Sequence, residues 1–271
     1  MDFSVLMSVY AKEKPEYLKR SIESIYRQTL PPPEVVLMED GALTEDLYRV
    51  IEEAKLRHPS FKVFTLKENC GLGHALNEGL RYCTYDLVAR MDSDDICKPN
   101  RFEKQISLFE RDPKLDICSA SIEEFRDEIS HVVCEKKLPE KHEDIVRYAR
   151  KRCPINHPAC VYKKQKVMDA GGYIGFPEDY YLWVRMIMNG CKFYNIQESL
   201  LWFRSSNSVY QRRGGWKYAR KEMYFQYLFY KIGFISFPRF ILNCLIRATV
   251  RIVPNKFRAY IYKNFIRHQQ I

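Results

Sequence analysis

The chain has 271 residues, of which 46% are hydrophobic and 29% are charged, and it carries a formal net charge of +10. This composition excludes an intrinsically disordered protein, and the length allows one large domain with ample chain to bury a core. Nine cysteines are spread singly, without any Cys-x-x-Cys pair, which argues against a disulfide scaffold or a structural zinc site and favours a reducing compartment.

The apolar segments do not resemble targeting or membrane-spanning sequences. The first ten residues lack the basic region and the small-residue cleavage site of a signal peptide. No window reaches the roughly 18 uninterrupted apolar residues that a membrane span needs, because the best candidate, Ile232–Val253, is interrupted by Pro238 and by arginines. We therefore expect a cytoplasmic protein, or one that lies on the membrane from its cytoplasmic side.

Short apolar runs alternate with helical patterns over the first 120 residues. Strands are expected at Phe3–Tyr10, Glu34–Met38, Phe61–Leu66, Asp86–Met91 and Leu115–Ser121. Helices are expected from Pro15 to about Leu30 and at Leu43–His58, Gly71–Tyr82 and Asn100–Arg111. This alternation predicts an α/β fold with a mostly parallel sheet, in which ligands bind at the carboxyl ends of the strands.

Acidic side chains follow two of these strands. The second strand runs into Glu39 and Asp40, and the fourth runs into Asp92, Asp94 and Asp95. Acids that converge on one sheet edge repel one another unless a cation is bound, and carboxylate oxygens suit Mg²⁺ or Mn²⁺. Either cluster alone could simply cap a helix, but two clusters on what we take to be neighbouring strand ends favour a metal site.

A glycine-containing turn, Asn69-Cys70-Gly71-Leu72-Gly73, follows the third strand. It is not a dinucleotide fingerprint, because Leu76 stands where the third glycine would be and the turn does not follow the first strand. The turn either presents backbone N–H groups to a diphosphate or only opens a helix.

Together these segments resemble glycosyltransferase family 2, whose members have the Rossmann-like GT-A fold. The resemblance rests on S-V-L-M-S-V-Y, V-V-L-M-E-D-G-A, N-C-G-L-G-H-A-L-N-E-G, A-R-M-D-S-D-D-I, N-H-P-A-C-V-Y and P-E-D-Y-Y-L-W-V-R. Glu39 departs from the pattern, since many relatives have Asp there. The resemblance spans about residues 3–205 and implies inverting transfer of a sugar from a nucleotide-sugar, with uridine favoured over guanosine.

The resemblance also implies roles for individual residues. Asp40 is expected to accept a hydrogen bond from the uracil ring, Asp92 to approach the ribose, Asp94 to bind Mn²⁺ or Mg²⁺ (with Asp92 as a possible second ligand), and Asp179 to be the general base. Glu178 and Arg185 are assigned to the catalytic group, and Arg185 is expected either to pair with a site carboxylate or simply to face solvent. The remaining nucleotide-sugar-binding candidates are Ser8, Val9, Tyr10, Glu13, Asn69, Gly71, Ser93, His157, Trp183, Arg212 and Arg213.

Several of these candidates have a plainer interpretation. Glu178 and Asp179 can serve as N-terminal caps of a helix that follows a Gly/Pro-rich turn. His157 can be a structural histidine, and Trp183 can be core rather than an apolar wall for a sugar ring. Arg212 and Arg213, next to Gly214-Gly215, suit a loop that closes over a diphosphate, or a solvated basic loop.

The positive charge is concentrated in the last quarter of the chain. Residues 203–271 contain 14 Lys and Arg and one acid, Glu222, whereas the residues before them carry 30 basic and 33 acidic side chains. After Phe234 the apolar residues recur with a helical period, and Arg239, Asn243, Arg247 and Arg251 form a polar stripe. A second basic, aromatic segment follows Pro254.

Basic amphipathic helices rich in Phe and Tyr suit an anionic membrane surface, although the apolar face can instead pack on the body or dimerise. Nucleic acid is not expected as a partner, because no recognised binding motif is present.

The working hypothesis is a GT-A catalytic domain over residues 1–205, with a nucleotide-sugar half (1–120) and an acceptor half (121–205), followed by a basic helical tail (206–271). We expect metal-dependent transfer from a UDP-sugar to a hydroxyl of a surface glycan, carried on a polyprenyl diphosphate at the inner face of the cell membrane. Two rivals stay open here: a metal-dependent nucleotidyltransferase, and a non-catalytic membrane-associated adaptor that keeps the fold.

Overall fold

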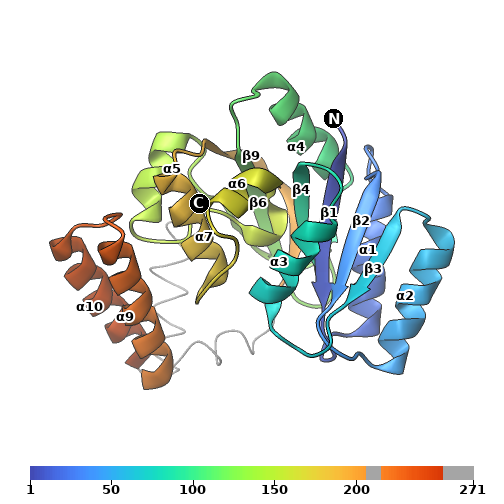
Figure 1. Cartoon of the computed structure of the whole chain (residues 1–271), viewed down its shortest axis with the longest axis horizontal. Coiled ribbons are helices and arrows are strands. Elements are labelled where there is room, and N and C mark those ends of the chain that lie inside the picture. The colour runs from blue at the N-terminus through green and yellow to red at the C-terminus, as the bar shows by residue number, and fades with distance from the viewer. Residues whose placement is uncertain (206–214, 253–271) are drawn as a thin grey trace.

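The computed structural model describes residues 1–205 and 215–252 (Figure 1). The helices are α1 (Pro15–Tyr26), α2 (Glu45–Arg57), α3 (Leu72–Tyr82), α4 (Arg101–Arg111), α5 (His142–Ala149), α6 (Lys164–Asp169), α7 (Glu178–Met188), α9 (Trp216–Lys231) and α10 (Phe237–Ile252). A short 3-10 helix, η1, covers His157–Ala159. The strands are β1 (Phe3–Val9), β2 (Glu34–Glu39), β3 (Phe61–Thr65), β4 (Leu87–Asp92), β5 (Ile96–Cys97), β6 (Ile117–Phe125), β7 (Val132–Lys136), β8 (Val161–Lys163) and β9 (Phe193–Arg204).

The described strands form one mixed sheet in the order β3-β2-β1-β4-β8-β6-β9-β5, with β7 paired to β6. The first four are parallel, as the sequence predicts. β8 then runs antiparallel to both β4 and β6, while β6 and β9 are again parallel. The sheet is therefore less uniformly parallel than expected, and its run of neighbouring parallel strands ends with β4.

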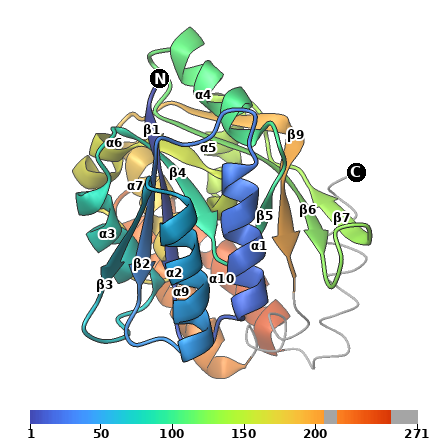
Figure 2. The same cartoon turned by 90° about the vertical axis from the view of Figure 1, so that its right-hand side faces the viewer.

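Helices cover both faces of the sheet. In Figure 2, α1 and α2 lie in front of the parallel strands, whereas α3 lies on the opposite face. Successive residues of β1 alternate between these layers: Val5 and Met7 pack in the core cluster with α1 and α2, and Leu6 packs with α3 and α7. Gly79 of α3 allows the close approach, since a Cβ there would lie 2.8 Å from Met38 Cγ and even closer to Leu6.

The predicted elements of the first half agree closely with the structure, except that β6 runs to Phe125 rather than to Ser121 and that α1 is shorter than expected. Helix α1 ends at Tyr26 rather than near Leu30. The reason is that Gln28 donates a side-chain hydrogen bond to Lys98 O at 2.8 Å, and Thr29 N donates to Pro99 O at 2.8 Å. These contacts tie the chain to the segment after β5, so the helix cannot continue. The short strands β5, β7 and β8 and the long strand β9 were not predicted individually.

Two residues of the polar stripe of α10, Asn243 and Arg247, contact other elements of the protein. Asn243 is 5% exposed and donates to Arg150 O at 2.9 Å and to Gln226 Oε1 at 2.8 Å. Arg247 contacts Glu222 of α9 and donates to Lys151 O. The helix therefore packs with these polar residues inward, while Phe237, Ile241, Leu242, Leu245 and Ile246 are exposed.

Helices α9 and α10 form an antiparallel pair beside α7 (Figure 1). Phe225 and Phe229 of α9 are fully buried against Tyr180 and Val184 of α7. Within the described part of the chain, no helix is both long and apolar enough to cross a bilayer. Arg212, Arg213 and the segment that follows Pro254 lie outside the described residues.

Candidate active site

Three carboxylates gather directly after β4. Oxygen atoms of Asp92, Asp94 and Asp95 all lie within 4.8 Å of one another. Asp95 is fully buried, and its Oδ2 has no hydrogen-bond partner in the described structure. Burial, followed by the charges of Asp92 and Glu13, raises the pKa of Asp94 to about 7. Clustered carboxylates that repel one another and leave a buried oxygen unpaired are a suitable oxygen-only ligand set for Mg²⁺ or Mn²⁺.

The loop that carries these carboxylates is held by other elements. Ser21 of α1 donates to Asp92 O at 2.9 Å, and Ser93 donates to Glu13 Oε2 at 2.7 Å. Arg204, at the end of β9, donates from Nε to Asp94 O at 2.9 Å and from its backbone N to Asp95 Oδ1 at 2.8 Å. The carboxylates are therefore positioned by the first helix and the last strand, and not by their own loop alone.

A buried arginine lies directly beneath the cluster. Arg90 has no exposed surface and forms an ion pair with Asp92 Oδ1. Its Nε has no hydrogen-bond partner among the described residues. Because Arg90 faces Asp92 from β4 itself, it orients that carboxylate toward the end of the sheet and supplies one fixed positive charge under the acidic loop.

The acids after β2 do not join this cluster, contrary to the expectation of a single acidic group. β1 lies between β2 and β4, so the two strand ends are not neighbours. Glu39 instead accepts a hydrogen bond from Thr65 Oγ1 at 2.6 Å. Asp40 accepts backbone N–H groups of Cys70 and Gly71 at 2.7 and 3.0 Å. The structure thus uses Asp40 to fix the glycine turn before α3.

The predicted donor-binding residues line the carboxyl ends of the four parallel strands. Ser8 pairs with Asp92 in the β1–β4 register, and Val9 O accepts a hydrogen bond from Asp40 N at 2.8 Å. Tyr10, just beyond β1, is 40% exposed. Asn69 donates to Asp40 O at 3.1 Å. With Gly71, these residues form a continuous edge from the glycine turn to the carboxylate cluster.

Glu178 and Asp179 are the first residues of α7, and contacts with α3 position them. A Cβ on Gly73 would lie 3.3 Å from Glu178 Cβ, so this glycine lets the two helix ends approach. Asn77 of α3 donates to Tyr173 O and accepts from Tyr173 N, both at 2.8 Å. Burial, and also the nearby charge of Asp179, raises the pKa of Glu178. The acids of α7 therefore lie across the same edge as the β4 loop.

Both oxygens of the Asp179 carboxylate have a neighbouring group. Its Oδ1 accepts a hydrogen bond from Tyr180 N at 2.7 Å, and its Oδ2 lies 3.9 Å from the thiol of Cys153. Burial raises the pKa of Cys153, so this thiol stays protonated and faces the carboxylate as a weak donor. The Asp179 carboxylate is therefore held at the first turn of α7, beside Cys153.

Two further predicted donor-binding residues lie in or near the core. Trp183 has no exposed surface and packs in the core with Tyr162 and Tyr173, so it is not an apolar wall for a sugar. His157 is 8% exposed, and its Nε2 lies 3.3 Å from the hydroxyl of Tyr173. Burial, and then the charge of Arg90, lowers the pKa of His157 well below its ordinary value. The imidazole is therefore neutral and brings no positive charge to a phosphate.

Arg185 does not reach a site carboxylate. Its guanidinium donates to the carbonyls of Ala170 and Gly172 and lies 4.7 Å from the centre of the Tyr181 ring. These bonds fix the glycine turn that leads into α7. In this structure Arg185 is thus a positioning residue for the segment that precedes Asp179.

Arg90, Arg204 and Asn77 contribute to the site but were not singled out from the sequence. Arg90 and Asn77 lie within the motifs A-R-M-D-S-D-D and A-L-N-E-G. Their place in these motifs could have marked them as candidates. Arg204 had no such signal, because its partners Asp94 and Asp95 lie more than a hundred residues earlier in the chain.

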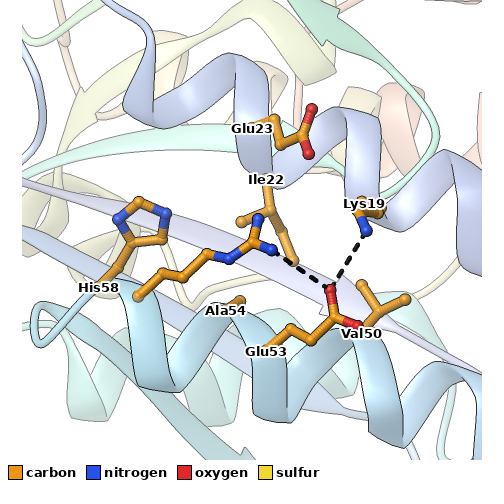
Figure 3. Close-up of a pocket in the computed structure, with 8 residues that line it drawn as sticks. Lys19, Ile22, Glu23, Val50, Glu53, Ala54 and His58 are labelled. Carbon is orange, nitrogen blue, oxygen red and sulfur yellow. Dashed lines mark hydrogen bonds and ion pairs between the residues drawn. The ribbon is translucent and has the colours of Figure 1, made fainter.

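A depression between α1 and α2 is remote from these residues. Figure 3 shows its lining, in which Glu53 pairs with Lys19 and Arg57. The free volume is about 20 Å³, enough for a single water molecule. It is therefore a surface feature of the helix pair and not a ligand site.

Comparisons with known proteins agree with this geometry. Residues 4–171 match the family model described as glycosyl transferase family 2. The chain is 43% identical over 267 residues to the UDP-Gal:alpha-D-GlcNAc-diphosphoundecaprenol beta-1,3-galactosyltransferase of Escherichia coli, covering 98% of this chain and 96% of that protein. It is 39% identical over 263 residues to the amylovoran biosynthesis glycosyltransferase AmsE of Erwinia amylovora, covering 96% and 98%.

Among solved structures, the chain resembles the mannosyltransferase PcManGT from Pyrobaculum calidifontis, determined in complex with GDP-Man and Mn²⁺. The TM-score is 0.63 at 16% sequence identity, over 97% of this chain and 75% of that one. At this identity the likeness concerns the fold.

Proposed function

Since the chain belongs to glycosyltransferase family 2, we propose that it transfers a sugar from a UDP-sugar to a hydroxyl of a lipid-linked acceptor, with inversion and with Mn²⁺ or Mg²⁺. One observation carries this proposal: a single sheet edge brings the carboxylates after β4 and the acids that begin α7 to the same place. Glycosyl transfer needs both a cation for the leaving group and a base for the acceptor. The family match confirms a GT-A glycosyltransferase and decides against a nucleotidyltransferase or an adaptor.

The donor is assigned to the ends of the parallel strands. The E. coli relative is named for UDP-Gal as donor, so UDP-galactose is the first candidate here. We place the uracil ring beside Tyr10, whose ring is exposed, and Asp40. Each oxygen of the Asp40 carboxylate already accepts one backbone N–H and keeps a second lone pair, which can accept from the base.

Asp94 and Asp92, with Asp95 behind them, would hold the divalent cation. When bound, this ion neutralises the charge of the diphosphate leaving group. The role of the chain is to present the oxygens in a fixed arrangement. Arg90 orients Asp92, while Ser21 and Arg204 hold the loop by its carbonyls.

Asp179 is proposed as the general base. Its carboxylate accepts the proton of the acceptor hydroxyl while that oxygen attacks the anomeric carbon. The bond from the anomeric carbon to the phosphate oxygen breaks, and UDP leaves with the bonding electron pair. Attack from the side opposite to the leaving group inverts the anomeric centre. Glu178 and the turn held by Arg185 position the helix end that presents Asp179.

The acceptor is proposed to be a sugar on a polyprenyl diphosphate, in the synthesis of a bacterial surface polysaccharide. This proposal is supported by the E. coli relative, named for a GlcNAc-diphosphoundecaprenol acceptor, and by AmsE, named for amylovoran biosynthesis. Such an acceptor lies in a membrane, and we infer peripheral association with its cytoplasmic face. The exposed apolar side chains of α10 are the surface in the described structure that suits this contact.

Two substitutions test the assignment of the cation and of the base. Asp94→Ala should abolish both turnover and the Mn²⁺-dependent binding of UDP measured by calorimetry. Asp179→Asn should lower turnover by about 10²–10⁴-fold, the usual contribution of a general base, while UDP binding stays within about twofold. Wild-type protein should release UDP and not pyrophosphate.

Asp169→Asn, on the exposed end of α6, is a matched control that should leave turnover and binding unchanged. Normal turnover by Asp179→Asn would contradict the base assignment, and normal Mn²⁺-dependent UDP binding by Asp94→Ala would contradict the cation site.

A further inference from the structure

One face of α9 combines aromatic rings with positive charges next to the catalytic helix. Trp216, Arg220, Lys221 and Tyr224 lie on one side of α9, at the first, fifth, sixth and ninth positions of the helix. Trp216 and Tyr224 are 64% and 63% exposed. The opposite side of α9 is buried against α7. Large aromatic side chains with so much exposed surface are unusual on a helix that is otherwise packed in this way. In the described part of the chain, this face of α9 is thus exposed.

The position of this face relative to the catalytic acids is fixed by a few contacts. Lys221 Nζ lies 5.2 Å from the centre of the Phe176 ring, and Tyr218 meets the same ring edge-on at 5.6 Å. Phe176 is followed by Pro177, which caps the helix that starts with Glu178 and Asp179. Lys221 thus contacts the segment that leads directly into the catalytic base.

The positive charges on this face have no acidic partner among the described residues. Arg220 and Lys221 form no ion pair there, whereas Glu222, the only acid of α9, pairs with Arg247 on the α10 side. Two adjacent cations without a counter-charge attract an anion, and a diphosphate offers several acceptor oxygens to both.

The surface of α10 next to this face of α9 is apolar. Helix α10 packs on α9 through contacts such as Tyr227 with Phe240, and its outer side chains Leu242, Leu245 and Ile246 are exposed and apolar. The surface therefore changes from the catalytic carboxylate, through cations and aromatic rings, to an apolar face. A lipid-linked sugar has the same order of groups: sugar, diphosphate and hydrocarbon.

We propose that this face of α9 is the acceptor subsite, in which Arg220 and Lys221 bind the diphosphate of a glycosyl diphosphate lipid and Trp216 and Tyr224 contact its flanking groups. The inference rests on the proposed function and adds the residues that recognise the acceptor. The diphosphate of the donor is still assigned to the carboxylate cluster after β4, which is a separate site.

Initial rates with two soluble acceptors test the subsite. One acceptor is GlcNAc joined through a diphosphate to a short alkyl chain, and the other is the same alkyl GlcNAc without the diphosphate. With UDP-galactose and Mn²⁺, R220Q/K221Q should raise KM for the diphosphate acceptor about ten- to hundredfold, the cost of two charge-assisted contacts. KM for UDP-galactose, and the rate with the acceptor that lacks the diphosphate, should not change.

The double variant R49Q/K55Q removes the same charge from the exposed surface of α2 and should behave as wild type. Equal thermal unfolding midpoints for the three proteins would show that the α9 variant folds. An unchanged KM for the diphosphate acceptor would overturn the subsite, and so would a raised KM for UDP-galactose.

Sedimentation with phosphatidylglycerol vesicles tests whether the anion that binds Arg220 and Lys221 is a lipid headgroup rather than the diphosphate of the acceptor. Loss of vesicle binding by R220Q/K221Q without a change in acceptor KM would assign the face to headgroups and overturn the proposal. A wild-type protein that transfers galactose to neither acceptor, and binds no UDP with Mn²⁺, would contradict the proposed function itself.

Discussion

Two arginines act on the carboxylate loop after β4 from different directions. Arg90 lies beneath Asp92 in the core, and Arg204 contacts the loop from the end of β9. The guanidinium of Arg204 lies between two rings, 3.8 Å from the centre of Tyr17 and 4.5 Å from that of Phe125. Stacking on the two rings fixes the plane of the Arg204 guanidinium while its N–H groups donate to backbone carbonyls. A lysine cannot reproduce this combination of contacts.

Glu34, at the start of β2, is another buried charged residue, and it links several strands of the sheet. It accepts hydrogen bonds from Lys62, Ser4 and Thr84 and so joins the first three strands to the segment before β4. Burial alone would raise its pKa, but these hydrogen bonds outweigh burial and lower the pKa of Glu34 to about 2. The ionised carboxylate is thus a stabilising group.

We expect Glu34→Gln to lower the free energy of unfolding by about 2 kcal/mol at pH 7, as measured in urea. Because the pKa of Glu34 is lowered on folding, its contribution is fully present above pH 4.5 and is lost as the pH falls toward 2. The difference between the variant and wild type should shrink over that range. Glu52→Gln, at an exposed position of α2, is the control, and a difference that does not depend on pH would contradict this explanation.

At the scale of single residues, the sequence singled out candidate acids but did not indicate which side chains surround them. Asp92, Asp94 and Asp179 follow from their motifs, because each lies at the start or end of an element that local pattern defines. Trp183 and Arg185 share a helix with Asp179, but their environments depend on Tyr173 and on the carbonyls of Ala170 and Gly172. Such partners come from separate segments, so helical spacing alone could not show which side faces the site.

At the scale of elements, the repeating strand and helix units were predictable and the later strands were not. The first four strands are short apolar runs that end at turn residues, and each is followed by a helical period. β5 has two residues and β8 has three, too few to show any alternation. For α10 the period indicated a polar stripe, but it could not show that Asn243 within that stripe bonds to Gln226 and Arg150 O on other elements.

The link between α3 and the turn before α7 gives an element-scale prediction. Asn77→Ala removes both hydrogen bonds to Tyr173 and leaves a backbone N–H and C=O without these partners. We expect about 2 kcal/mol of destabilisation and a lower kcat with UDP-sugar KM unchanged, because the carboxylate loop after β4 is held separately.

Asn189→Ala, at the exposed end of α7, removes the same side chain and is the matched control. Urea unfolding and initial rates provide the measurements. An Asn77→Ala protein with wild-type kcat would show that this link does not position Asp179.

At the scale of the whole molecule, the basic charge and the apolar face are separate features. The sequence placed both on one amphipathic helix, whereas the structure turns the polar residues of α10 toward α9 and the body. The apolar side chains form the exposed face, while Arg220, Lys221 and Lys231 lie exposed on the adjacent α9. A membrane contact would therefore combine hydrophobic burial by α10 with attraction from α9.

Co-sedimentation of the full chain with vesicles tests this arrangement. L242D/L245D should reduce binding to phosphatidylglycerol-containing vesicles at least tenfold, because it removes apolar contact and adds repulsion from anionic lipid. Turnover with a soluble acceptor should not change.

Leu56→Asp introduces the same kind of change on α2, where Leu56 is 86% exposed, and should bind as wild type. Equal binding by wild type and L242D/L245D would exclude this face as the contact, and equal binding to neutral and anionic vesicles would exclude the electrostatic part.

The pairing of β5 with β9 has a consequence for how the enzyme is made. The carboxylate loop lies between β4 and β5, and β5 pairs with Leu201 and Trp202 of β9, directly before Arg204. A nascent chain on the ribosome cannot complete the carboxylate loop until residue 204 has left the exit tunnel. The loop proposed to hold the cation is therefore finished only after helix α7, with the proposed base Asp179, has been synthesised.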